Sequence, residues 1–418
     1  MWQLCSFLLL YLLQFTSDKE SVYVLTANKR FHAQCCKYSI KRCITSREIK
    51  MIPFPGYVIA LYEANFLSEL NEPSLRKIKY LAFAPSLNKQ FTAGELPDSI
   101  TDLHLGYRFN QPILPGSLPT SLTRLTFGGR FKQSFDFGAL PASLVHLRFS
   151  GGEYVGRDLL PDTITHMTID AFRNRPVPNN SFWPRKLTHL TLRDCDTPIL
   201  KNSLPDTITD LEFGDYFDCQ VAPGTLPESL TRLTFGYFFD QVIIAGSLPN
   251  SITHLSFRGY FNEPIREGVL PKCLTHLTLS RKFNQRIEPG SLPNAITHLT
   301  FGDEYNQPIS VGAMPEKLTH LTFGDKFTQE IVTGSLPNTL THLSFGAFFN
   351  QLTTVGSLPN SLTHLRFGAH FNRYLVSGML PDGLVHLTLN SIYEGYYNYT
   401  HGGSVFPKSL TYLVYEPY

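Results

Sequence analysis

One dipeptide step recurs along this chain at a nearly constant interval, and that interval constrains the fold more than any other feature. The step is Leu-Pro or a close substitute, and from Pro205 to Pro381 its period is 22 residues without exception. A fixed period of 20–50 residues is typical of a solenoid or repeat array. The fifteen prolines that mark the step are Pro97, Pro119, Pro141, Pro161, Pro184, Pro205, Pro227, Pro249, Pro271, Pro293, Pro315, Pro337, Pro359, Pro381 and Pro407.

Each unit carries the same short alternation after its proline, as the copy that begins at Pro337 illustrates. Leu340, Leu343 and Phe345 lie three, six and eight residues after that proline, with Thr, His and Ser among the residues between them. Alternation with period two over so few residues predicts a short strand with one apolar face. One unit buries too little apolar surface to fold alone, so neighbouring coils have to stack and pair their strands. Leu and Phe are then expected to point inward, and His and Thr outward.

Glycines mark two further points of the unit. Gly346 directly follows the strand, where we expect a backbone angle that glycine tolerates best. Eleven of the fifteen prolines have glycine three residues before them, which predicts a turn. The other four prolines have turn-forming residues there, namely Asp158, Ser181, Asn202 and Ser404.

The repeated phrase resembles known repeat families. The spacing Leu-x-x-Leu-x-Phe is similar to that of leucine-rich repeats, and Phe-Asn-Gln-Pro-Ile at 109–113 resembles the FNIP repeat. That repeat is known from social amoebae and from giant DNA viruses that infect amoebae. The resemblance implies a β-rich, right-handed, leucine-rich-repeat-like coil stack with one short parallel strand per unit.

The patterns divide the chain into four segments. They are a small α-helical module at 1–50, degenerate opening repeats at 51–95, the regular solenoid at 96–390 and a C-terminal capping repeat at 391–418. In the opening repeats Ile78, Leu81 and Phe83 carry the strand spacing, and a weaker unit begins at Pro53. Between about 150 and 205 the period falters, which indicates either neutral decay or a bend or exposed loop used for binding.

Residues 1–50 lack the repeat. Two apolar stretches flank Ser17-Asp18-Lys19-Glu20, which predicts two or three short helices. The stretch resembles the middle of an F-box, and that resemblance implies docking on the small adaptor subunit of cullin-type ubiquitin ligases. The residues that match the apolar positions of the family are Leu9, Leu12, Leu13, Val24, Leu25 and Phe31.

Two other interpretations of this segment stay open. It could be a secretory signal peptide, although no Lys or Arg precedes its apolar core. It could also be a plain helical cap that shields the first coil from solvent, which a solenoid needs in any case.

Composition narrows the class of partner. The chain has 36 Lys plus Arg against 34 Asp plus Glu without a basic stripe, so neither nucleic acid nor a membrane surface is expected to bind it. No run of 18 apolar residues predicts a membrane span. Of the seven cysteines, an odd number, four lie within residues 5–43 and three lie singly in separate units, which fits a reducing, cytoplasmic location better than a disulfide-stapled ectodomain.

Histidine is the most conspicuous chemical group of the array. Ten units have His five residues after the proline, and the others have Asp102, Arg124, Asp210, Arg232 or Tyr412 there. Stacked coils would place these side chains in a file, which indicates either a structural ladder or a binding surface. A metal site is the third interpretation, although a file of one residue type lacks the tetrahedral ligand set and the oriented outer ligands of a zinc site. The ten are His146, His166, His189 and the candidate target-binding set His254, His276, His298, His320, His342, His364 and His386.

These patterns favour an interaction protein over an enzyme. No Gly-x-Ser-x-Gly, His-Glu-x-x-His or phosphate-binding glycine loop occurs, so neither catalysis nor a cofactor or metal is expected. The first hypothesis is an adaptor that brings a target protein to a cullin-type ligase. The alternatives are a plain scaffold whose first helices are only a cap, and a secreted leucine-rich-repeat receptor. In each case the histidine file is expected to destabilise the fold as pH falls below about 6.

Overall fold

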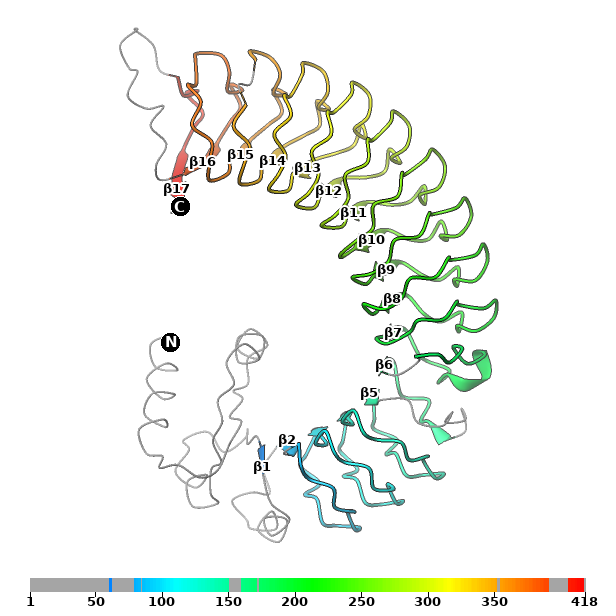
Figure 1. Ribbon diagram of the computed structural model, residues 1–418. Helices are drawn as coiled ribbons and strands as arrows, with labels where there is room; N and C mark the ends of the chain where they lie inside the picture. Colours follow the sequence, from blue (N-terminus) through cyan, green and yellow to red (C-terminus); the bar gives the residue numbers. More distant parts are fainter. Residues whose placement is uncertain are drawn as a thin grey trace, which may run out of the picture. The chain divides into compact units, whose positions relative to one another are not determined.

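A computed structural model describes most of the repeat array and leaves residues 1–59 out. The described residues are 60–61, 79–83, 85–149, 159–170, 173–351, 354–390 and 405–416. Contacts group the chain into two compact units: Met1–Asp170 with Ser181–Leu187, and Ala171–Asn180 with Thr188–Tyr418. Each unit is a stack of coils with one short strand per coil (Figure 1). The predicted helical module at 1–50, with its F-box-like residues, lies outside the described part.

The strands of each unit are parallel, and each pairs with the next one in sequence. In the first unit they are β1 (Ala60–Leu61), β2 (Tyr80–Phe83), β3 (Asp102–His104), β4 (Arg124–Thr126), β5 (His146–Phe149) and β6 (His166–Ile169). In the second they are β7 (His189–Leu192), β8 (Asp210–Phe213), β9 (Arg232–Phe235), β10 (His254–Phe257), β11 (His276–Thr278), β12 (His298–Thr300), β13 (His320–Thr322), β14 (His342–Ser344), β15 (His364–Arg366), β16 (His386–Asn390) and β17 (Tyr412–Glu416).

The register of the strands equals the sequence period. Leu321 pairs with Leu299, and His320 pairs with His298. The amides of Thr319 and His320 both donate to the carbonyl of Thr297, each at 2.9 Å. Because paired strands keep this register, residues at equivalent positions of neighbouring repeats lie above one another. The predicted parallel solenoid of roughly 22-residue units is confirmed.

The core is a double file of phenylalanines backed by leucines. Phe345 directly follows strand β14. Its ring stacks on that of Phe349 in the following turn, with centroids 3.8 Å apart, and on that of Phe367 in the next coil, at 5.6 Å. Leu343, between the two outward residues of its strand, is 2% exposed. Stacked rings at these distances add to the area that they bury, so neighbouring coils stabilise one another through repeated contacts.

Two kinds of glycine serve different purposes in a coil. Gly334 has φ 82°, and Asn202 takes the corresponding left-handed turn in its own unit with φ 62°. This turn was expected. The prediction for Gly346 was wrong, because its φ is not in the left-handed region. A Cβ there would lie 2.1 Å from the carbonyl oxygen of Gly324, so glycine is needed for the close approach of two coils.

The Phe-Asn-Gln phrase, or a variant of it, follows the strands of the regular units and forms a second ladder. The Oδ1 atom of Asn284 accepts the amide of Asn306 at 2.8 Å, and Oδ1 of Asn306 accepts the amide of Thr328 at 2.9 Å. Nε2 of Gln307 also donates to Oδ1 of Asn284, at 3.2 Å. Asparagine thus satisfies turn amides that no strand partner reaches.

The irregular stretch between 150 and 205 contains buried aromatic residues in its described part. Trp183 is fully buried and meets Phe182 edge-on at 4.9 Å, next to the 3-10 turn η3 (Asn180–Phe182). Val177, in the proline-rich run before it, is also buried. This segment therefore supplies core side chains where the regular Phe-Asn-Gln phrase is missing.

Candidate functional site

The predicted histidine file exists in the second unit. The rings of His254, His276, His298, His320, His342, His364 and His386 stack in order, one per coil, on strands β10 to β16. Neighbouring ring centroids are 4.1–4.3 Å apart and the planes differ by 9–13°. Tyr412 continues the stack on β17, at 4.3 Å and 7° from His386. We call this surface, the outward residues of β10–β16, the histidine face.

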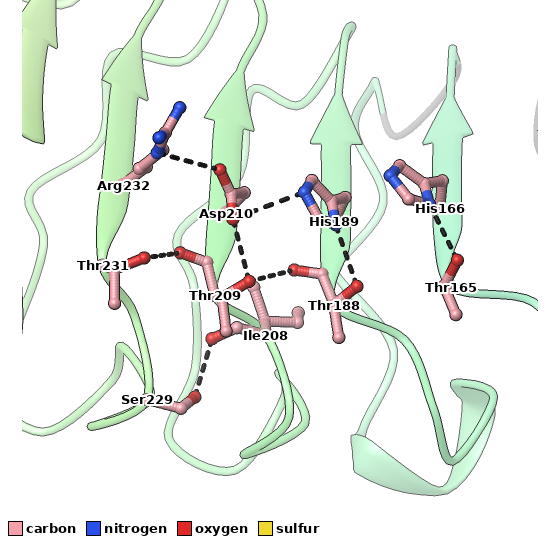
Figure 2. Close-up of polar contacts among 10 residues, drawn as sticks. All are labelled: Thr165, His166, Thr188, His189, Ile208, Thr209, Asp210, Ser229, Thr231 and Arg232. Carbon is pink, nitrogen blue, oxygen red and sulfur yellow. Dashed lines mark hydrogen bonds and ion pairs between the residues drawn. The ribbon is translucent and has the colours of Figure 1, made fainter.

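In six of the seven coils, the threonine before the histidine contacts its ring. Oγ1 of Thr319 lies 2.9 Å from Nδ1 of His320 and also donates to the main-chain oxygen of Thr297 at 3.0 Å. The same two contacts recur in six consecutive coils, from Thr253-His254 to Thr363-His364. The threonines therefore anchor the imidazoles to the backbone of the preceding coil. Figure 2 shows the threonine–histidine contact at Thr188 and His189.

The surroundings of the file disfavour the charged form of the imidazoles. Burial, and then the adjacent imidazoles, lower the pKa of His342 to about 4. Burial is also the main cause that lowers the pKa of His276, His320 and His364. At His254 burial and the Arg232 guanidinium lower the pKa, against the opposing effect of Asp210. These imidazoles are consequently neutral at pH 7.

Strands β8 and β9 carry charged residues instead of histidine. Asp210 and Arg232 occupy the first position of these strands, where histidine lies in β10–β16. Oδ2 of Asp210 lies 3.5 Å from Nε2 of His189, and its Oδ1 lies 3.7 Å from Nε of Arg232 (Figure 2). Nearby, Glu212 pairs with Arg258 at 2.8 Å. One end of the second unit therefore presents alternating charges.

The first unit shows a shorter version of both arrangements. Asp102 and Arg124 lie 3.8 Å apart on β3 and β4. His146 and His166 stack at 4.2 Å on β5 and β6. The regular seven-ring file is therefore a feature of the second unit.

Sequence reasoning located the histidines but missed two features. It did not foresee the hydroxyl contacts, although Thr precedes six of the seven histidines of the face. It also missed a row of exposed aromatic rings, Tyr216, Phe238 and Tyr260, eleven residues after successive prolines. Their rings lie 5.7–5.8 Å apart, and the Arg173 guanidinium covers Tyr216 at 4.3 Å. The recurrence of aromatics at that one position was the available signal.

Within the described residues no group of three or more His, Cys, Asp or Glu side chains is arranged to hold a metal ion. In the same residues no helix has the length and apolar character needed to cross a bilayer.

Comparisons with known proteins agree on the architecture. The FNIP Repeat model matches residues 87–130, 109–152, 157–214, 196–238, 239–282, 283–326, 305–348 and 349–391. The crystal structure of CroV588, described as a novel circular LRR protein, is 38% identical with a TM-score of 0.59, over 81% of this chain and 56% of that one. No curated protein matches the chain.

A more distant structure shares the fold alone. A chain of the Drosophila Toll–Spatzle complex is 15% identical with a TM-score of 0.59, over 87% of this chain and 55% of the other. This chain thus spans just over half the length of both solved chains.

Proposed function

The chain belongs to the FNIP repeat family, and on that premise we propose that it is a non-enzymatic adaptor that recruits a target protein to a cullin-type ubiquitin ligase. In this proposal the histidine face of the solenoid holds the target. The segment at 1–50 docks on the adaptor subunit of the ligase through its F-box-like leucines, and the complex acts in the cytoplasm.

The observation that carries the target-binding half is the histidine face itself. Seven half-buried rings form one continuous, rigid strip that neither the core nor another element covers in the described residues. Preorganised aromatic surfaces lose little conformational entropy on binding, and they are enriched at protein interfaces. A strip of this kind supports binding of a protein, because it has no enclosed geometry that would surround a small substrate.

A capture experiment with the full chain tests the face. His298→Gln, His320→Gln and His342→Gln combined remove three adjacent rings and keep a polar side chain at each position. The matched control is Val311→Ser with Val355→Ser, because both valines are exposed in turns before the proline. Targets captured by the wild-type and control chains should be lost with the triple variant. Equal capture by all three proteins would place binding elsewhere.

The ligase half has its own test. Leu12→Asp with Leu13→Asp should abolish co-purification of the cullin adaptor while capture of the target is retained. Retained adaptor binding would remove the F-box proposal and leave a plain scaffold whose first residues cap the solenoid. A mature protein that begins near Thr16 would instead favour the secreted receptor.

A further inference from the structure

A row of exposed aromatic rings lies in the turns that follow strands β8 to β10. Phe238 and Tyr260 are 44% and 40% exposed, and the centroids of their nearly parallel rings are 5.7 Å apart. Tyr237 meets both rings edge-on, at 5.3 and 5.0 Å. The amides of the two exposed residues donate to main-chain oxygens of the preceding coil, at 2.9 and 2.8 Å. The chain therefore holds these rings in place, so that binding to them costs little conformational entropy.

In several other coils of this unit the chain itself supplies a partner at the same position, eleven residues after the proline. The Arg173 guanidinium covers Tyr216, 4.3 Å from the ring centroid. In later coils Glu304 lies 3.5 Å from Lys282 and 2.6 Å from Lys326. No cation of the described residues lies over the next two rings of the row. Arg173 thus shows, within the chain, the kind of contact that those two rings lack.

The coils that carry the rings also have aspartate in the turn ladder, where later coils have asparagine. Oδ1 of Asp218 accepts the amide of Asp240 at 3.0 Å and Nε2 of Gln241 at 2.9 Å. Oδ1 of Asp240 accepts the amide of Asn262 at 2.8 Å. Asn284 accepts the next amide but one in the same way without a charge, so the ladder does not need the second oxygen of a carboxylate. Within the described part of the chain no cation pairs with either aspartate.

The neighbouring charges favour a cation as the occupant of this surface. Asp215 and Glu263 add two carboxylates to the same three turns. Arg258, Arg281 and Lys282 are already ion-paired within the chain, at 2.8–3.5 Å. Charge complementarity of this kind selects partners and speeds their association. We call the exposed rings and the two ladder carboxylates the ring–aspartate surface: Phe238, Tyr260, Asp218 and Asp240.

We propose that the ring–aspartate surface binds an arginine-bearing segment of a partner protein. Phe238 and Asp240 are both exposed on either side of the buried Phe239, and their Cα atoms are at most about 7 Å apart. An arginine side chain is long enough to lay its methylenes on the rings while its charged head reaches a carboxylate. Its planar fork donates to the Oδ2 atoms that the ladder does not use, and it stacks on aromatic rings better than an ammonium does. This contact is additional to the histidine face and does not depend on it.

A capped, fluorescently labelled tetra-arginine peptide is the probe, and its anisotropy with the full chain measures the affinity. Asp218→Asn with Asp240→Asn keeps the acceptor that the ladder uses and removes both charges, so it should weaken binding roughly 3–30-fold. The matched control is Asp303→Asn with Asp325→Asn, which removes two exposed carboxylates from later turns and should have less than about a twofold effect. An equal loss in both double variants would mean attraction to net charge alone, and would overturn the inference.

The rings have their own pair of variants. Phe238→Ala with Tyr260→Ala should weaken the same peptide roughly 2–10-fold, because the arginine loses its aromatic contact. The control is Phe348→Ala with His370→Ala, since those rings stack at 4.9 Å in equivalent turns whose ladder residues are asparagines. The control should leave the affinity unchanged. Equal effects of the two pairs would overturn the inference.

The identity of the occupant is tested by three comparisons. Tetralysine and hexaproline should both bind more weakly than tetra-arginine, and equal binding of either would refute the arginine chemistry. The triple glutamine variant of the histidine face should retain the peptide, whereas a loss would assign the peptide to that face. Self-association of the chain that disappears in Phe238→Ala with Tyr260→Ala would assign the surface to a second copy. Each of these results is separate from target capture, so failure of the inference leaves the proposed function standing.

Discussion

Strands β8–β9 and strands β11–β14 occupy equivalent positions in the same unit, yet the threonine hydroxyls before them have different hydrogen-bond partners. At Thr209 the hydroxyl faces two acceptors, Oδ2 of Asp210 at 2.8 Å and the Thr188 oxygen at 3.3 Å (Figure 2). A single proton cannot satisfy both equally. At Thr319 the second neighbour is an imidazole nitrogen, which can donate or accept according to the tautomer of the ring. A neutral histidine can therefore adapt to the hydroxyl, whereas the aspartate carboxylate can only accept.

The difference extends to charge. The Asp210 carboxylate lies between the His189 ring and the Arg232 guanidinium, whereas the rings of His298, His320 and His342 stack on one another. The contacts of the charged stretch therefore require oppositely charged residues on neighbouring coils. The contacts of the neutral stretch require the same residue on every coil. A charge introduced into the uniform stretch has no partner prepared for it.

The largest effect is expected when aspartate is moved into the uniform stretch. His320→Asp removes two ring contacts, at 4.2 and 4.1 Å, and adds a second acceptor beside Thr319. We expect a loss of about 1–3 kcal/mol of stability from the ring contacts alone. Thermal unfolding at pH 7.5 measures it, with His320→Asn as the control without charge. If both variants unfold at the same temperature, the added charge is of no consequence.

Acidification should weaken the neutral stretch. The folded-state pKa of His342 is lowered to about 4 from an unfolded value near 6.5. A lowered pKa means that folding favours the neutral ring, so its contribution is complete above pH 6.5 and declines progressively from there to about pH 4. Thermal midpoints should fall between pH 7.5 and 5, and fall less in the triple glutamine variant. A midpoint that does not change with pH in the wild-type chain would contradict this.

The destabilisation caused by His320→Asp should itself depend on pH. The new carboxylate is expected to favour the charged form of His298 and His342, as an opposite charge nearby does. Its destabilisation should therefore be smaller at pH 5.5 than at pH 7.5. The opposite trend would show that the adjacent rings do not pair with the carboxylate.

The repeat period and the strand alternation sufficed to predict the coil stack and the histidine file. Both follow from local patterns: a register of one repeat places residue five of every unit above residue five of the last. The purpose of Gly346 could not be inferred this way, because its need for a bare Cα comes from Gly324 in another coil. Sequence shows which residues recur, but not how closely two backbones approach.

The hydrogen bonds of the histidine face could not be predicted from the sequence, because they also depend on contacts between coils. Thr319 precedes His320 in the chain, and its hydroxyl also contacts an oxygen one coil away. That second contact, to the main-chain oxygen of Thr297, depends on how the coils stack and is not visible in the sequence. The buried Trp183 is a similar case, since the loss of the repeat pattern around it does not indicate that this segment contributes to the core.

The smallest effect is expected on the charged side of the comparison. Asp210→Asn removes the charge opposite His189 and Arg232 but keeps an oxygen that Thr209 can reach. The side chains of His189 and Arg232 are 45% and 64% exposed, so solvent screens both contacts of the carboxylate. We expect a loss of at most about 1 kcal/mol, smaller still in 0.5 M salt. A larger, salt-independent loss in chemical denaturation would mean that the carboxylate supports the coil through its hydrogen bond, and the two stretches would then differ less than their charges suggest.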